Sequence, residues 1–176
     1  MTKLNLYSIF SYFLIVIAAI FGLLSLLGLL MALVNPALLL SVFIIASVVI
    51  YCTASFIFLQ KGINSNQHLQ PRLKDWIKVN AYVAIVFVAM NIFQSVAVIS
   101  NPSVLQKVMK QSFGMQAFES PLSETFILKM IKVVVWFMLI YSTILGIHIL
   151  QTFRYLKEYA HLFAEKKNNN SANGSI

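Results

Sequence analysis

Residues 4–60 read LNLYSIFSYFLIVIAAIFGLLSLLGLLMALVNPALLLSVFIIASVVIYCTASFIFLQ and contain no charged side chain. The charges nearest to this stretch are Lys3 and Lys61. A single membrane crossing needs only about 20 apolar residues, so the stretch is long enough for two crossings. Pro36 divides it, because proline restricts the residue before it and suits the first turn of a helix. The stretch therefore predicts two antiparallel apolar helices joined by a short turn.

The composition of the whole chain supports a membrane protein. Of its 176 residues, 60% are hydrophobic and 10% are charged, and the mean hydropathy is +0.84. Soluble domains are about 45–50% apolar and about 25% charged. The net charge of +8 does not indicate nucleic-acid binding, because the lysines and arginines cluster just outside the apolar segments, as membrane topology requires. The first apolar segment is about twice as long as the apolar region of a signal peptide, so we expect an uncleaved span.

The predicted fold is an all-α, integral membrane bundle of four helices, built from two antiparallel hairpins. One membrane domain covers residues 1–167, and residues 168–176 are a polar tail that we expect to be disordered. The fourth helix is expected to run from about residue 121 to about residue 165 and to project from both sides of the membrane. The four spans cover about residues 7–34, 37–60, 78–100 and 133–153.

The segment at about 103–113, between the third and fourth spans, is predicted to be a short amphipathic helix. Its apolar residues fall on one half of a helix and its polar residues on the other: Val104, Leu105, Val108 and Met109 against Gln106, Lys107, Lys110 and Gln111. Such a helix either lies at the membrane surface or packs over the end of the bundle.

The distribution of lysine and arginine predicts the orientation. Nine of the 13 lie on the side of the two termini and of the loop at 61–78, and four lie on the other side, between residues 101 and 132. Cytoplasmic segments carry the excess of these residues. We therefore expect both termini in the cytoplasm, with the protein in the plasma membrane.

The third span carries polar side chains on one helical face. At 100° per residue, Asn80, Asn91 and Ser95 lie within about 60° of one another. Gln94 lies beside them. Amides that face lipid are costly, so this face should point into the bundle, where Tyr141 of the fourth span lies at the depth of Asn91. Two interpretations stay open: these side chains line a polar cavity, or they form hydrogen bonds between helices.

His148 is the only histidine within the predicted spans. As a functional residue it would relay protons or bind a ligand near the inner leaflet. As a structural residue it would hydrogen-bond to Asn80 or to a backbone carbonyl at similar depth. The other histidines do not have metal-ligand spacing with it, and the single cysteine, Cys52, forms neither an internal disulfide nor a Cys-based metal site. We expect no metal and no other cofactor.

The first span carries a stripe of small residues. The stripe consists of Ala18, Gly22 and Ser25, with Gly28 nearby. Small residues at this spacing let two helices approach closely. The neighbouring helix is either the second span of the same chain or a helix of a second copy.

The spans lack the groups on which membrane catalysis and ion coupling usually depend. Their only charged residue is Lys78, at the edge of the third span, and the sequence has no His-Glu-x-x-His motif. We therefore expect no enzymatic activity. The favoured function is an assembly or accessory subunit that associates, helix to helix, with a membrane-protein partner or a second copy in the lipid bilayer. The alternative is a small channel or transporter subunit for a neutral polar solute.

Overall fold

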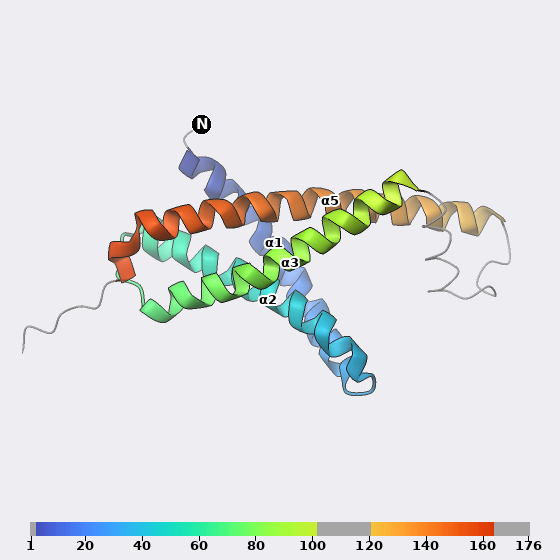
Figure 1. Ribbon diagram of the computed structural model, residues 1–176, viewed down its shortest axis with the longest axis horizontal. Helices are drawn as coiled ribbons and strands as arrows, with labels where there is room; N and C mark the ends of the chain where they lie inside the picture. The colour runs from blue at the N-terminus through green and yellow to red at the C-terminus, as the bar shows by residue number, and fades with distance from the viewer. Residues whose placement is uncertain (1–2, 102–120, 164–176) are drawn as a thin grey trace, which may run out of the picture.

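The structure, a computed structural model, describes residues 3–101 and 121–163, and every element in this part of the chain is helical (Figure 1). The long helices are α1 (Lys3–Ala32), α2 (Leu39–Ile57), α3 (Pro71–Ser100) and α5 (Pro121–Glu158). The short segments are the 3₁₀ helix η1 (Pro36–Leu38), the π-helix η2 (Phe58–Asn64) and the 3₁₀ helix η4 (Ala160–Phe163). For these residues, the prediction of an all-helical chain with four long apolar helices is confirmed.

Within the part of the chain that the structure describes, four helical segments are long and apolar enough to cross a membrane. They are Leu4–Ala32, Pro36–Asn64, Pro71–Ser100 and Phe126–Glu158. Their lengths of 29 to 33 residues exceed the requirement of about 20, and each overlaps one predicted span. By length and composition they indicate an integral membrane protein. The predicted amphipathic helix at 103–113 and the predicted tail at 168–176 lie outside the described residues.

The turn between α1 and α2 is short because a new helix begins at once. The side chain of Asn35 accepts a hydrogen bond from the Ala37 backbone N–H at 3.2 Å, and Pro36 occupies the first position of η1. This bond satisfies an N–H that has no partner inside the helix. As a result, α1 and α2 run side by side in opposite directions (Figure 1).

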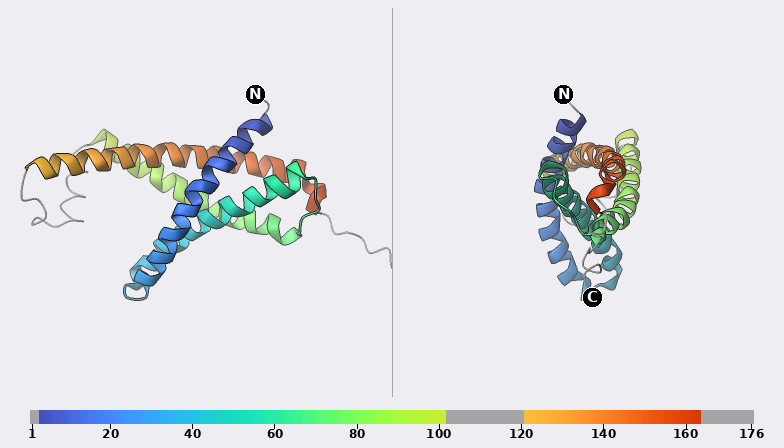
Figure 2. Two further views of the ribbon diagram at one scale, coloured as in Figure 1. Left: turned by 180° about the vertical axis from the view of Figure 1, so that it is seen from behind. Right: turned by 90° about the vertical axis from the view of Figure 1, so that its left-hand side faces the viewer.

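Each long helix packs mainly on the next one along the chain. α2 lies against α1 and α3, α3 packs on α5, and α1 makes a smaller contact with α5. The α1–α2 pair crosses the α3–α5 pair, and the turn at 33–38 points away from the ends of α3 and α5 near Ser100 and Pro121 (Figures 1 and 2). α2 and α3 therefore diverge toward η1.

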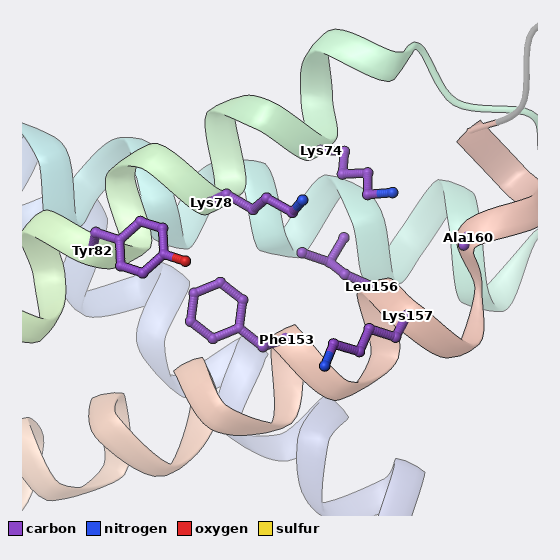
Figure 3. Close-up of a pocket in the computed structure, with 7 residues that line it drawn as sticks. All are labelled: Lys74, Lys78, Tyr82, Phe153, Leu156, Lys157 and Ala160. Atoms are coloured by element: carbon purple, nitrogen blue, oxygen red, sulfur yellow. The ribbon is translucent and has the colours of Figure 1, made fainter.

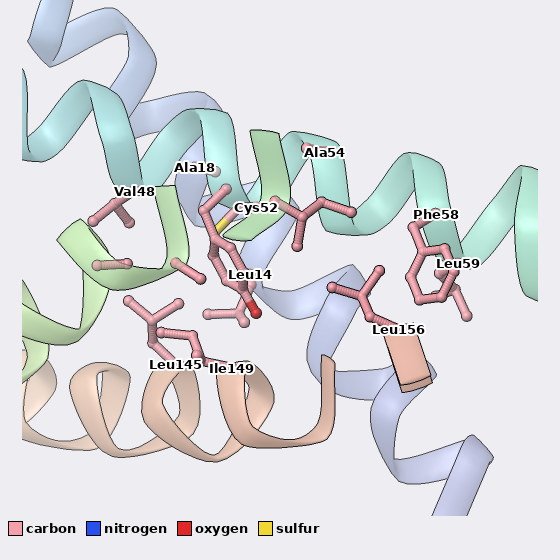
Figure 4. Close-up of a cluster of buried hydrophobic side chains, with 14 of the residues drawn as sticks. Leu14, Ala18, Val48, Cys52, Ala54, Phe58, Leu59, Leu145, Ile149 and Leu156 are labelled. Atoms are coloured by element: carbon pink, nitrogen blue, oxygen red, sulfur yellow. The ribbon is translucent and has the colours of Figure 1, made fainter. Parts of the chain in front are cut away.

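The core lies where the helices cross, and it continues toward η2 (Figure 4). Its buried side chains include Leu14 and Ala18 of α1, Val48 and Cys52 of α2, Leu145 and Ile149 of α5, and Phe58 and Leu59 of η2. Away from the crossing, apolar side chains remain exposed, including Leu23 at 66% and Val133 at 68%. Helices that are apolar around their whole circumference suit a hydrocarbon environment.

The last helix ends earlier than the sequence predicted. A helix to about residue 165 is wrong for residues 159–163, because the α-helix stops at Glu158 and η4 follows. The Leu162 carbonyl accepts a hydrogen bond at 2.8 Å from the backbone N–H of Leu69, which lies in the α2–α3 loop. Leu162 and Phe163 are buried. This hydrogen bond to a loop that is distant in the sequence, together with the burial of Leu162 and Phe163, accounts for the end of the α-helix at Glu158.

Candidate functional site

His148, on α5, is fully buried and uses both of its ring nitrogens. The Ser11 hydroxyl of α1 lies 2.8 Å from Nε2, and the Tyr51 hydroxyl of α2 lies 2.8 Å from Nδ1. A neutral imidazole has one donor and one acceptor nitrogen, so two hydroxyl partners satisfy it completely. The histidine thus connects three helices by side-chain hydrogen bonds.

Two further side chains complete the arrangement around His148. The Thr152 hydroxyl lies 2.9 Å from the Tyr51 hydroxyl and 3.3 Å from the Tyr7 hydroxyl. The ring of Tyr7 stacks on the imidazole with 4.7 Å between centroids and an angle of 7° between planes. We call Tyr7, Ser11, Tyr51, His148 and Thr152 the histidine network. Its aromatic and hydrogen-bonding contacts fix the position and the plane of the imidazole.

Both tautomers of His148 fit the histidine network. With the proton on Nε2, the imidazole donates to Ser11, Ser11 donates to the Tyr7 carbonyl at 2.9 Å, and Tyr51 donates to Nδ1. With the proton on Nδ1, the imidazole donates to Tyr51, and Ser11 donates to Nε2. Hydroxyl groups can reverse in this way because each one both donates and accepts. The geometry accordingly retains both hydrogen bonds to His148 in either state.

The histidine network is closed to its surroundings. Tyr7, Tyr51, His148 and Thr152 are 0% exposed, and Ser11 is 2% exposed. Such burial leaves no direct contact with a substrate or with lipid. The arrangement is suited to holding α1, α2 and α5 together at one depth, because buried polar groups favour the packing that satisfies them all.

Sequence reasoning found His148 but not its partners. It pointed to Asn80 or a backbone carbonyl, but the partners are two hydroxyls, and the Asn80 amide donates to the Trp76 carbonyl at 2.8 Å. Tyr7, Ser11 and Tyr51 were missed, although the first two are one helical turn apart and all three lie toward the predicted cytoplasmic side, as His148 does. Their predicted depth, which matches that of His148, was the signal that could have identified them as its partners.

The polar residues of α3 lie apart from the histidine network. Asn91 donates to the Phe87 carbonyl at 3.0 Å, and Ser95 is buried. Asn91 and Gln94 line a cavity of about 170 Å³ together with Ser41 of α2. Within the described part of the chain, Gln94 is exposed and forms no hydrogen bond. The structure therefore brings Asn91 and Gln94 together beside α2.

Tyr141 is fully buried beside other aromatic residues. Its ring meets that of Phe21 edge-on, with 5.3 Å between centroids. Its hydroxyl makes no hydrogen bond of good geometry to a described residue, and its polar neighbour is the thiol of Cys52, a weak hydrogen-bonding group. Ser142 Oγ and Gln151 Oε1 are likewise buried without a partner among the described residues.

The small residues of α1 face α2 of the same chain. A Cβ atom on Gly28 would lie 3.0 Å from a methyl of Val42, and one on Gly22 would lie 3.6 Å from a methyl of Val49. Ala18 is fully buried, and Ser25 is half-buried. The missing side chains of the two glycines thus allow α1 and α2 to approach each other closely.

Among the described residues, no group of three or more His, Cys, Asp or Glu is placed to hold a metal ion. No known protein family, curated protein or solved structure matches the chain. The class of protein therefore rests on its four long apolar helices and on the side chains that connect them.

Proposed function

We propose that this protein is a non-enzymatic assembly or accessory subunit that acts by helix–helix association in the plasma membrane, with both termini in the cytoplasm. The observation that carries the proposal is the exposed amide of Gln94. This side chain lies about 9 Å from the end of α3, within its apolar segment. It forms no hydrogen bond to any residue that the structure describes.

An amide without a partner is costly in hydrocarbon. Each unsatisfied polar group in the bilayer core costs several kcal/mol, because no water is present to bond it. The side-chain amide of Asn91, nearby, donates a hydrogen bond to the Phe87 carbonyl of the same helix. The Gln94 amide makes no such bond to a described residue. A second helix that places an amide or hydroxyl opposite Gln94 would remove this cost.

The surroundings of Gln94 suit a helix as its partner. Phe93 is 76% exposed and Met90 is 48% exposed, so apolar surface flanks the amide. α2 and α3 diverge toward η1 (Figure 2). The cavity beside Ser41 and Gln94, of about 170 Å³, has room for a side chain of an additional helix. The occupant that we propose is an apolar transmembrane helix of a partner membrane protein, with one polar side chain at the depth of Gln94.

The test is site-specific photocrosslinking in the native membrane. A photoreactive residue replaces Met90, next to Gln94, and the same residue at Val79, which is 63% exposed near the other end of α3, is the control. Position 90 should yield one defined protein adduct, whose crosslinked peptide is a membrane helix with a polar residue, and position 79 should yield lipid adducts. Gln94→Leu should abolish the protein adduct, while Phe93→Leu should retain it.

Three results would contradict the proposal. Lipid adducts alone at position 90 would mean that Gln94 faces the bilayer. A protein adduct that persists in Gln94→Leu would mean that the amide does not select the partner. An adduct between two copies of this chain would replace the accessory role with self-association.

A second candidate function is a small channel or transporter subunit for a neutral polar solute. The cavity of about 170 Å³ beside Ser41, Asn91 and Gln94 favours it, since these side chains offer both donors and acceptors. Reconstituted protein should then pass such a solute across vesicles, and Asn91→Leu should abolish flux without loss of helicity. Equal flux in vesicles with and without the protein would reject this candidate.

A further inference from the structure

A cavity lies between α3 and α5, near the loop at 65–70 and η4 (Figure 3). Its volume is about 590 Å³, within the range of about 300–1,000 Å³ that is typical of small-molecule sites. Lys74 and Lys78 extend into it from α3, and Lys157 extends from α5. This cavity is separate from the histidine network and from Gln94.

Among the described residues, the charged side chains that line this cavity are all positive: three are lysines and none is a carboxylate. Lys74 and Lys78 are half-buried, and Lys157 is exposed. The amine of Lys74 also lies 5.9 Å from the centre of the Phe163 ring, a cation–π contact. Like charges that line one cavity favour the binding of an anion between them.

The other end of the cavity is apolar and aromatic. The rings of Tyr82 and Phe153 lie 5.7 Å apart at an angle of 39°, and Leu156 contributes an aliphatic wall. Lys74 and Tyr82 are separated by eight residues of α3, or about 12 Å along the helix. The cavity thus changes from cationic at the polar loop to aromatic toward the middle of the apolar helices.

We propose that this cavity binds the phosphate headgroup of an anionic membrane lipid. Lys74, Lys78 and Lys157 contact the phosphate, and Tyr82 and Phe153 lie against the first carbons of an acyl chain. An anionic phosphate group is the chemistry that a lipid headgroup and a soluble phosphate share. The lipid is the source that fits, because a soluble phosphate would use only the lysines and would leave the aromatic wall without a role. Basic pockets between membrane helices commonly bind anionic headgroups.

The test measures lipid binding to the full-length protein in mild detergent by native mass spectrometry. The probes are phosphatidylglycerol, phosphatidylcholine and inorganic phosphate. Phosphatidylglycerol should bind at least tenfold more tightly than phosphatidylcholine, and inorganic phosphate should not compete. Each Lys→Gln change at 74, 78 or 157 should weaken binding about fivefold, and the triple variant about 100-fold.

A matched control removes three charges elsewhere. Lys61→Gln, Arg72→Gln and Arg154→Gln together change the net charge equally, but these side chains are exposed and do not line the cavity. This control should keep affinity within about twofold of the parent chain. Equal losses in the two triple variants would overturn the proposal, because binding would then depend on total charge alone.

A second variant distinguishes the two sources of phosphate and does not depend on the fold of a triple variant. Tyr82→Ala removes a side chain that is 64% exposed and should weaken phosphatidylglycerol binding several-fold. Competition by inorganic phosphate at equal concentration, with Tyr82→Ala unchanged, would overturn the lipid assignment in favour of a soluble phosphate. Equal binding of phosphatidylcholine and phosphatidylglycerol would overturn the anion site itself.

Discussion

Removal of one hydroxyl, by Tyr51→Phe, tests whether the histidine network stabilises the helix packing. The Tyr51 hydroxyl lies 2.8 Å from His148 Nδ1 and 2.9 Å from Thr152 Oγ1. Phenylalanine keeps the ring, which meets the imidazole edge-on at 5.8 Å between centroids. The change therefore removes hydrogen bonds from a buried site without creating a large cavity.

The magnitude follows from the partners that remain. Thr152 can still donate to the His148 carbonyl at 2.8 Å, so it loses little. Nδ1 of His148 loses its only partner and stays fully buried. Leaving a buried group unsatisfied costs about 1–3 kcal/mol, while a hydrogen bond between membrane helices contributes about 0.6 kcal/mol on average. We expect Tyr51→Phe to lower the free energy of unfolding by about 1–2 kcal/mol.

The assay is reversible unfolding from mixed micelles by sodium dodecyl sulfate, followed by far-ultraviolet circular dichroism. Tyr82→Phe is the matched control, because its hydroxyl forms no hydrogen bond to a described residue and the side chain is 64% exposed. The control should change the free energy of unfolding by less than about 0.5 kcal/mol. In a double-mutant cycle, Tyr51→Phe and Ser11→Ala should deviate from additivity by at least about 0.5 kcal/mol, because both contact His148.

The reasoning is refuted if Tyr51→Phe is no more destabilising than Tyr82→Phe. The same holds if the effects of Tyr51→Phe and Ser11→Ala simply add. Either result would mean that apolar packing alone holds α1, α2 and α5 together, and that the two hydroxyls beside His148 are energetically neutral.

Two further predictions concern the α2–α3 loop and the topology. Gly62→Ala should lower the free energy of unfolding by about 1–3 kcal/mol, since its new methyl would lie 2.8 Å from a Leu69 methyl and 3.1 Å from the Phe58 ring, and both of these side chains are buried. In Gly22→Ala, the control, the new methyl would lie 3.6 Å from its nearest neighbouring atom. This change should alter the free energy of unfolding by less than about 1 kcal/mol in the same assay. Equal losses of stability in the two variants would contradict the argument. A membrane-impermeant maleimide should label Val34→Cys but not Gln67→Cys in intact cells, because the Lys and Arg distribution predicts that the 61–78 loop lies inside. The natural cysteine is buried and should not react. The opposite labelling pattern would reverse the proposed orientation.

The helices themselves could be predicted from the sequence because their causes are local. The length of each apolar run and the position of Pro36 are enough to place the four long helices. The end of α5 could not be predicted, because it depends on the hydrogen bond between Leu69 and Leu162, whose backbones come from distant parts of the chain.

The buried site was only partly predictable for a similar reason. The polarity of His148 in an apolar helix marks it as a residue that needs partners. Which residues those are depends on the neighbouring helices, and Ser11 and Tyr51 reach it from α1 and α2. No periodicity within one helix encodes such contacts, whereas the close approach of Gly28 to Val42 follows from small residues facing the adjacent helix.

The wide separation of these partners along the chain has a consequence for biosynthesis. Ser11 and Tyr51 are translated long before their partner His148. Leu69 is likewise translated long before Leu162, whose carbonyl accepts its backbone N–H. α1 and α2 can pair as soon as both are inserted, but the Tyr51 hydroxyl stays without its partners, His148 and Thr152, until the last helix joins them. A truncated chain therefore exposes hydroxyl and amide groups that the complete chain hides, and these are the groups by which a membrane chaperone or protease can distinguish an unfinished protein from a finished one.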